Sequence, residues 1–297
     1  MTAVVNTDIV TGKVNRSLAS RIVARTGGGA LQIVLIVIAV IWLVPTFGLL
    51  VESLRGSQHY TAGGWWQALV HPGQLTWSNY SAIFHNHGLT HSFFNSVKIT
   101  VPATIGVVLI GSAAGYAFAW MEFPGRDWVF LVVVALLVVP LQIALIPTVK
   151  LYHTLHLSGS IYGVVLYHVA FGLPFAIFLL RNFFSGIPRD LLEAARMDGA
   201  SERRIFFRII VPLGLPAIAS LAIFQFLWVW NDLLVALIFA SPKNQPLTVF
   251  LADQTRQFGS SIDVLAPGAF LSLIVPMAVF LVFQRFFVQG VLAGSVK

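Results

Sequence analysis

The sequence contains no cysteine, so the chain can form no disulfide bond and offers no thiolate as a metal ligand or nucleophile. Charged residues are also scarce: they make up 10% of the chain, whereas a typical soluble domain carries roughly 25%. So few charges cannot cover the surface of a soluble globule of 297 residues. The composition therefore excludes a soluble protein, and the apolar surface is predicted to face lipid.

Motifs for nucleotide binding and for covalent catalysis are missing as well. Thr11-Gly12-Lys13-Val14 lacks the upstream glycine and the following Ser or Thr of the phosphate-binding loop GxxxxGK[ST], and no lysine follows Gly27-Gly28-Gly29. The sequence shows no nucleophile–base pair and no carboxylate dyad. We therefore predict that the chain is not an enzyme and holds no cofactor, so energy from ATP would have to come through a separate subunit.

Long apolar runs are what the sequence has instead. A membrane span needs about 20 apolar residues, and each run must satisfy its own backbone hydrogen bonds as a helix. Six runs reach this length: Leu31–Val51, Ile99–Trp120 with a polar lead-in from His91, Trp128–Val149, Ile161–Leu180, Leu213–Ala240 and Val264–Gln284. The predicted fold class is all-α, a polytopic membrane protein with six transmembrane helices. Prolines inside several runs, such as Pro140, are expected to kink them.

The distribution of Lys and Arg predicts the orientation, because cytoplasmic segments of membrane proteins are enriched in these residues. If the N-terminus is cytoplasmic, 13 of the 18 Lys and Arg lie inside, and five lie outside: Arg55, Lys98, Lys150, Lys243 and Arg256. Both termini are therefore predicted to be cytoplasmic. Residues 1–30 would form an N-terminal tail, 31–290 the transmembrane domain and 291–297 a C-terminal tail. No nucleic-acid partner is expected from the net charge of +7.

One predicted cytoplasmic segment, residues 185–212, is too organised to be only a connection. Pro188 suits the first position of a helix, Gly199 can adopt the left-handed conformation that ends one, and Ser201 can cap a second short helix. The segment therefore predicts a helix, a sharp glycine turn and a second helix at the inner membrane face. Small residues flanked by charged ones would let another protein approach closely and dock there.

The same segment resembles the EAA loop of importer permeases. It reads Glu193-Ala194-Ala195, three residues, Gly199, nine residues, Ile209, one residue, Val211-Pro212. The family pattern is EAA-x3-G-x9-I-x-L-P, and the one departure is Val211 in place of leucine. In that family the loop is a coupling helix that seats in a cleft of the ATPase subunit. The resemblance implies the following ATPase-coupling residues: Glu193, Ala194, Ala195, Asp198, Gly199, Ile209 and Pro212.

Further motifs resemble the carbohydrate-uptake branch of these permeases, the maltose-permease G type. They are Phe94-Asn95-Ser96, Phe123-Pro124-Gly125-Arg126, Trp230-Asn231-Asp232 and the C-terminal segment from Gly290 to Lys297. The phrase from Phe224 to Leu234 resembles permeases for α-glucosides in particular. The resemblance runs from about residue 31 to the end of the chain.

The resemblance implies a type I (MetI-like) importer bundle in the bacterial inner membrane, which works by alternating access. The implied partners are a second homologous permease that completes a heterodimer, two ATP-binding-cassette subunits that bind ATP and Mg²⁺, an extracytoplasmic solute-binding protein, a carbohydrate substrate and the lipid bilayer. Another solute, such as a polyol or glycerol phosphate, remains the alternative within the family.

Asp232 is the one carboxylate deep inside a predicted span, and an ionisable group there calls for a functional explanation. Two interpretations stay open. Asp232 and Asn231 could line a substrate pathway and bind sugar hydroxyls, with Trp228 stacking on a sugar face. Alternatively, Asp232 is a structural anchor that binds a neighbouring helix, which is the interpretation that we favour.

The sequence argues against a secondary transporter and against a metal site. An ion-coupled secondary transporter would need several intramembrane carboxylates and usually repeated halves, and the sequence has one such carboxylate and no repeat. The histidines His85, His87 and His91 lie close in sequence, but their spacing matches no standard metal signature. We therefore interpret them as part of a polar outer loop and predict no metal site.

Overall fold

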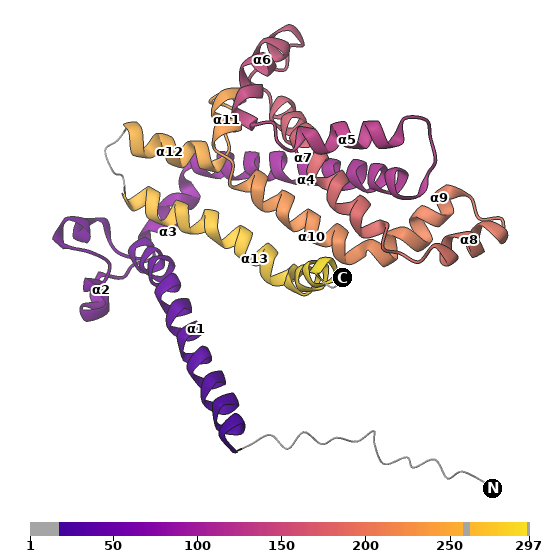
Figure 1. Ribbon diagram of the computed structural model, residues 1–297. Coiled ribbons are helices and arrows are strands. Elements are labelled where there is room, and N and C mark those ends of the chain that lie inside the picture. The colour runs from indigo at the N-terminus through magenta and orange to yellow at the C-terminus, as the bar shows by residue number, and fades with distance from the viewer. Residues whose placement is uncertain (1–17, 258–261, 296–297) are drawn as a thin grey trace.

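The computed structural model describes residues 18–257 and 262–295 (Figure 1). These residues form helices and loops with two isolated bridges and no strand, which confirms the all-α prediction. The helices are α1 (Leu18–Ser53), α2 (Gln67–Val70), α3 (Ser78–His85), α4 (His87–Trp120), α5 (Arg126–Leu136), α6 (Leu141–Thr154), α7 (Ile161–Phe184), α8 (Arg189–Met197), α9 (Glu202–Ile205), α10 (Val211–Trp230), α11 (Leu234–Phe239), α12 (Leu247–Gln257) and α13 (Ile262–Ser295).

All six predicted apolar runs are helical within the described residues. Four lie in single helices, the third is a bent pair, and the fifth is divided between α10 and α11. The kink expected in Trp128–Val149 is a complete break of the helix, because α5 and α6 meet at an angle of 102°. Pro140 stands between them in an extended conformation, with φ −63° and ψ 129°. Its ring removes a backbone donor and disfavours a helical conformation of Val139, so the helix stops there.

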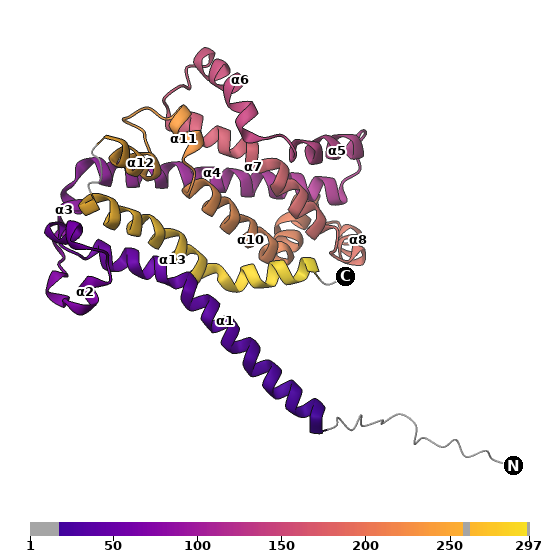
Figure 2. The same cartoon turned by 60° about the vertical axis from the view of Figure 1, so that its left-hand side comes forward.

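The centre of the bundle is formed by α4, α7 and α10, which lie side by side in both ribbon views (Figures 1 and 2). Glycines let α4 approach α7 closely. A Cβ atom at Gly111 would lie 2.7 Å from the Cβ of Ala176, and one at Gly115 would lie 2.9 Å from the Cβ of Leu180. Any larger residue at these two positions would push the helices apart.

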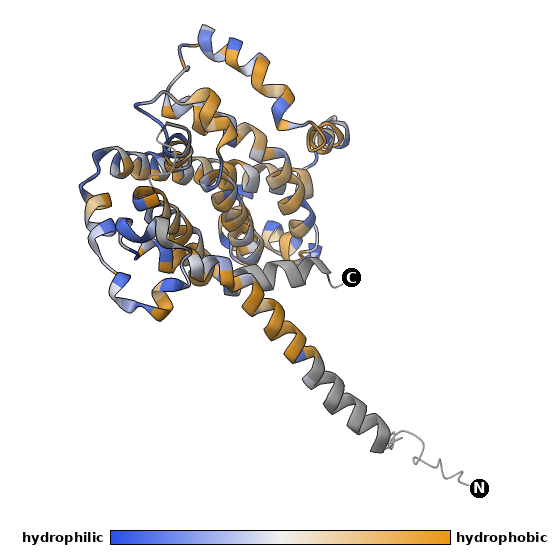
Figure 3. Ribbon diagram, turned by 90° about the vertical axis from the view of Figure 1, so that its left-hand side faces the viewer, coloured by the Kyte–Doolittle hydropathy of each residue, from blue (hydrophilic) through white to orange (hydrophobic). Residues whose placement is uncertain are grey.

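The first helix leaves the bundle, as Figures 2 and 3 show. It contains the predicted run Leu31–Val51, and side chains such as Ile41 and Trp42 are more than half exposed. An apolar surface of this extent has to be covered by lipid or by another chain. The helix itself already begins at Leu18, inside the predicted tail, and α13 continues to Ser295, through most of the other predicted tail. Residues 1–17 and 296–297 lie outside the described residues.

Candidate functional site

The segment predicted to dock another protein folds as expected into helix, turn and helix. Helix α8 begins directly after Pro188 and is closed by Gly199, which has a φ of 76°. The turn is a Schellman motif, since the N–H of Gly199 donates to the carbonyl of Arg196 and the N–H of Ala200 donates to that of Ala195, each at 3.0 Å. A positive φ of this kind strains most L-residues, so the turn requires glycine.

One side of α8 is anchored in the bundle. Leu192 is fully buried, and it belongs to the same hydrophobic cluster as Phe184 of α7 and Ile205 of α9. The other side is open: the next residue before it, Leu191, is 47% exposed, and Met197 is 88% exposed. The helix, at one end of the bundle (Figure 1), is thus fixed in position while Leu191 and Met197 stay exposed among charged side chains such as Glu193.

A polar link connects this segment with the centre of the bundle. The hydroxyl of Tyr116 on α4 donates to Glu202 at the start of α9, and Arg196 of α8 donates to the same carboxylate over 2.9 Å. The bond with Glu202 raises the pKa of the Arg196 guanidinium. The ring of Tyr116 also contacts Phe206, in the π-helical turn Phe206–Ile210 that leads into α10. Both short helices are therefore tied to α4.

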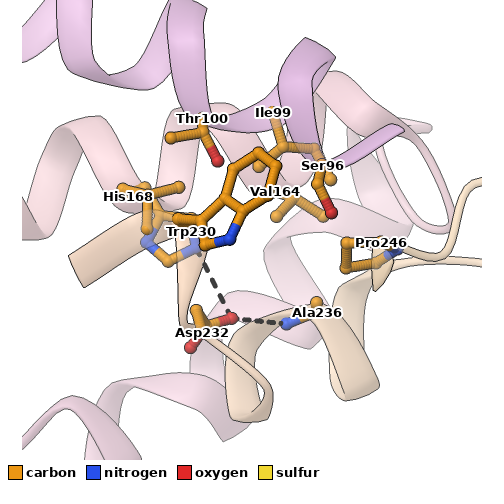
Figure 4. Close-up of a pocket in the computed structure, with 10 residues that line it drawn as sticks. Ser96, Ile99, Thr100, Val164, His168, Trp230, Asp232, Ala236 and Pro246 are labelled. Atoms are coloured by element: carbon orange, nitrogen blue, oxygen red, sulfur yellow. Dashed lines mark hydrogen bonds and ion pairs between the residues drawn. The ribbon is translucent and has the colours of Figure 1, made fainter. Parts of the chain in front are cut away.

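Asp232 lies where α10 ends, so the prediction of one helix over Leu213–Ala240 was wrong. The last residue of α10 is Trp230, and the carboxylate of Asp232 accepts the backbone N–H groups of Val235 and Ala236, over 3.3 and 3.0 Å (Figure 4). These are the first donors of α11, where a negative charge is stabilised by the helix dipole. A broken helix at this depth is possible because a side chain satisfies the freed N–H groups.

A buried histidine faces the same carboxylate. Nε2 of His168, on α7, lies 3.6 Å from Asp232, and the histidine side chain is 1% exposed. The two residues share a cavity of about 10 Å³ with Ser96, Thr100 and Trp230 (Figure 4). This space holds no more than about one water molecule. A sugar cannot enter it in this conformation.

Comparison with known proteins shows the family of the chain. Residues 97–293 match the family model described as "Binding-protein-dependent transport system inner membrane component". The chain belongs to this family. It is a multi-pass membrane permease of an ATP-binding-cassette importer, a transport subunit rather than an enzyme.

Two curated relatives of the permease are each 48% identical to it. One is an osmoprotective compounds uptake permease of Synechocystis sp., matched over 90% of this chain and 91% of its own length. The other is an alpha-glucoside transport system permease of Rhizobium meliloti, matched over 76% of this chain and 61% of its own length. A solved bacterial ABC transporter for the import of alginate shares the fold, with a TM-score of 0.73, 22% identity and coverage of 89% of this chain and 97% of that chain.

The residues predicted to couple the permease to the ATPase lie in two groups. Glu193, Ala194, Ala195, Asp198 and Gly199 lie together on α8 and its closing turn, and the carboxylate of Glu193 pairs with Arg189 over 2.7 Å. Ile209 and Pro212 lie apart from that group, in the π-helical turn and the first turn of α10. Ile209 packs against the hydrophobic cluster that includes Leu192, whereas Pro212 is exposed.

The three residues grouped as a possible substrate pathway do not share a cavity. Asp232 lines the small cavity beside His168, whereas Trp228 lines a separate groove on α10. Asn231 is exposed, and its amide donates to the carbonyl of Leu227 at the end of the same helix. The rule that singled out Asp232 could also have found His168, which is an ionisable side chain inside the predicted run Ile161–Leu180. Its pairing with Asp232 has no local signal in the sequence.

The link between Tyr116 and Glu202 leads to a first prediction. Replacing Tyr116 with phenylalanine keeps the ring but removes a hydrogen bond to a charged group, which is worth about 1.5–3 kcal/mol. We expect a lower melting temperature of the complex and uptake reduced severalfold. Tyr162→Phe is the matched control, because Tyr162 is 76% exposed on α7. Unchanged uptake and unchanged melting temperature in Tyr116→Phe would show that the link has no role.

The geometry of Asp232 leads to a second prediction. Asp232→Leu removes the acceptor for two backbone N–H groups, so we expect a loss of about 0.5–2 kcal/mol of stability and a lower yield of assembled complex. Asp232→Asn should lose less, since asparagine still caps a helix. Sugar selectivity of the complex that does form should be that of the wild type. Altered selectivity at full yield of Asp232→Asn would instead place Asp232 in the substrate pathway.

Proposed function

We propose that the permease forms one half of the translocation pathway of an ATP-driven sugar importer, and that α8 and its glycine turn couple it to a separate ATPase subunit. The observation that supports the coupling role is that α8 is buried on one side and exposed on the other. Leu192 is fully buried while Leu191 and Met197 are exposed among charged residues, so the bundle holds the helix on one side and leaves the other side free for a partner. A rigid element in contact with both subunits can transmit a motion between them.

The proposed substrates are α-glucosides or similar small neutral glycosides. The similarity to the alpha-glucoside permease supports this class, as does the resemblance of the segment from Phe224 to Leu234. The similarity to the osmoprotective compounds permease supports a second candidate, an osmoprotective solute, for which we propose a polyol. Both candidates are uncharged and carry many hydroxyl groups.

The proposed assembly contains a second homologous permease, two ATPase subunits that bind ATP and Mg²⁺, and an external solute-binding protein. The exposed apolar side chains of α1 and of the bent pair α5–α6, such as Trp42, Val138 and Ile146, support contacts with lipid and a second permease. The excess of Lys and Arg in the segments on the side of α8 supports cytoplasmic termini, with α8 facing the cytoplasm.

The proposal is tested by reconstituting the complete transporter, with its binding protein, in liposomes. Ligands of the purified binding protein are first identified by thermal shift with α-glucosides, polyols and glycerol phosphate. Uptake of the best ligand is then measured with ATP inside the liposomes, and separately with a proton or sodium gradient and no ATP. We expect uptake of a neutral glycoside that requires both ATP and the binding protein. Uptake driven by an ion gradient alone would overturn the proposal.

A further inference from the structure

Three exposed arginines lie close together where the chain enters α10: Arg203, Arg204 and Arg208. Arg208 follows Arg204 by four positions and Arg203 by five. Residues four apart are neighbours on an α-helix, and a π-helical turn such as Phe206–Ile210 repeats its hydrogen bonds after five. Like charges at this spacing repel one another. The arrangement of the cluster therefore favours an anion between the three guanidinium groups.

No described side chain supplies that anion. Glu202, the acidic residue directly before the cluster, is already bound by Arg196 and by Tyr116. Other arginines on the side of α8 have an acidic or aromatic partner: Arg126 with Asp127, Arg181 with Phe130, Arg189 with Glu193 and Arg196 with Glu202. Among the described side chains, the three clustered arginines have neither an ion pair nor a contact with an aromatic ring.

The cluster begins at the level where two spans end. Helix α4 ends at Trp120, and its indole N–H donates to the carbonyl of Phe184, the last residue of α7, over 2.9 Å. Tyr116, one turn earlier on α4, contacts Glu202. The arginine cluster therefore begins within about one helical turn, roughly 5 Å, of the ends of α4 and α7. At this level the hydrocarbon core gives way to the lipid headgroups.

Arg208 lies further along the span, about 6 Å deeper than Arg204 at 1.5 Å per residue. Side chains of a helix lean towards its N-terminal end, which is here the membrane surface, so the guanidinium of Arg208 can return to the level of the headgroups. Phe207, the preceding residue, is apolar and 62% exposed. A soluble ATPase subunit that docks on α8 does not reach this depth, whereas a lipid offers a phosphate for the arginines and an acyl chain for the ring.

We infer that Arg203, Arg204, Arg208 and Phe207 form a binding site for an anionic phospholipid, whose phosphate binds the guanidinium groups and whose acyl chain covers the phenylalanine ring. Guanidinium groups suit this role because their N–H groups bind phosphate oxygens in pairs. Clusters of arginine beside a span attract anionic lipids. A lipid bound here holds the entry to α10, next to the docking turn, at the membrane surface. The inference goes beyond the proposed function and does not depend on the transported solute.

The test measures lipid binding to the complete purified transporter by native mass spectrometry, with phosphatidylglycerol as the anionic probe and phosphatidylcholine as the lipid without net charge. An arginine near an anionic lipid surface changes the affinity about fivefold. We expect the affinity for phosphatidylglycerol to fall about fivefold in Arg208→Gln, and further when all three arginines are replaced by glutamine. Arg208→Lys keeps the charge and should retain most of the affinity. Arg126→Gln is the matched control, because Arg126 lies at the same end of the bundle and is paired with Asp127.

Uptake is measured in parallel in liposomes of phosphatidylcholine with and without phosphatidylglycerol, and we expect the anionic lipid to stimulate the wild type more than the triple variant. Equal affinities of the wild type and the triple variant for phosphatidylglycerol overturn the lipid site. If the triple variant loses the ATPase subunit in every lipid, the arginines bind that subunit, and the inference is likewise overturned. Should the triple variant fail to assemble, Arg208→Gln decides by the same titration, and an affinity equal to that of the wild type overturns the site.

Discussion

Uptake is expected to be abolished when Gly199 is replaced by valine, while the protein still inserts in the membrane. A Cβ atom at this position would meet no other atom within 4 Å, so crowding plays no part. The strain lies in the backbone alone, since a φ of 76° is strongly unfavourable for a β-branched residue. Relief of that strain requires the turn to open, which changes the direction of α8 relative to α9.

The measurements for Gly199→Val are uptake, co-purification of the ATPase subunit and the amount of permease in the membrane. Gly199→Asn is the matched control, because asparagine tolerates the left-handed conformation better than other non-glycine residues. We expect this control to retain a large part of the wild-type uptake. Normal uptake and normal ATPase association in Gly199→Val would contradict the assignment of the turn to coupling.

The second large effect is expected for Leu192→Ala. Truncation of a fully buried leucine costs about 2–5 kcal/mol, and here the loss falls on the contact that holds α8 against Phe184 and Ile205. We therefore expect a lower melting temperature of the complex together with poor coupling of ATP hydrolysis to uptake. Both quantities are measured on the same purified complex in liposomes.

Leu191→Ala is the matched comparison, since Leu191 is the preceding residue on the same helix but faces outward. Its truncation should leave the melting temperature of the permease nearly unchanged and weaken association with the ATPase subunit. If Leu191→Ala destabilises the permease as much as Leu192→Ala does, the two faces of α8 do not have the separate roles proposed here.

The predictions that succeeded from sequence concern features encoded within a short stretch of chain. Apolar runs such as Ile161–Leu180 reveal a span because lipid contact depends on the composition of that run alone. Pro188 and Gly199 reveal the ends of α8 because each acts through its own backbone conformation. The helix, turn and helix of residues 185–212 are therefore predictable from the local sequence.

Helix breaks inside apolar runs were predicted less well. Pro140 predicted a kink but not the 102° angle of the break. Hydropathy averages over a run, so it does not detect the end of α10 before Asp232. Whether a proline kinks a helix or ends it depends on what satisfies the freed backbone groups. At the end of α10 the freed N–H groups are bound by the side chain of Asp232. After Pro140 the hydroxyl of Tyr167 donates to the carbonyl of Leu141 and so helps to hold the start of α6.

The sequence alone thus determined the membrane class, the family and the helix, turn and helix of residues 185–212, because each rests on composition or on a local motif. Only the tertiary structure decided which side chains meet across the bundle: Tyr116 with Glu202, and His168 with Asp232. These pairs join residues on different elements. Their partners are set by the packing of α4, α7 and α10, which brings distant residues together and which no local pattern in the chain encodes.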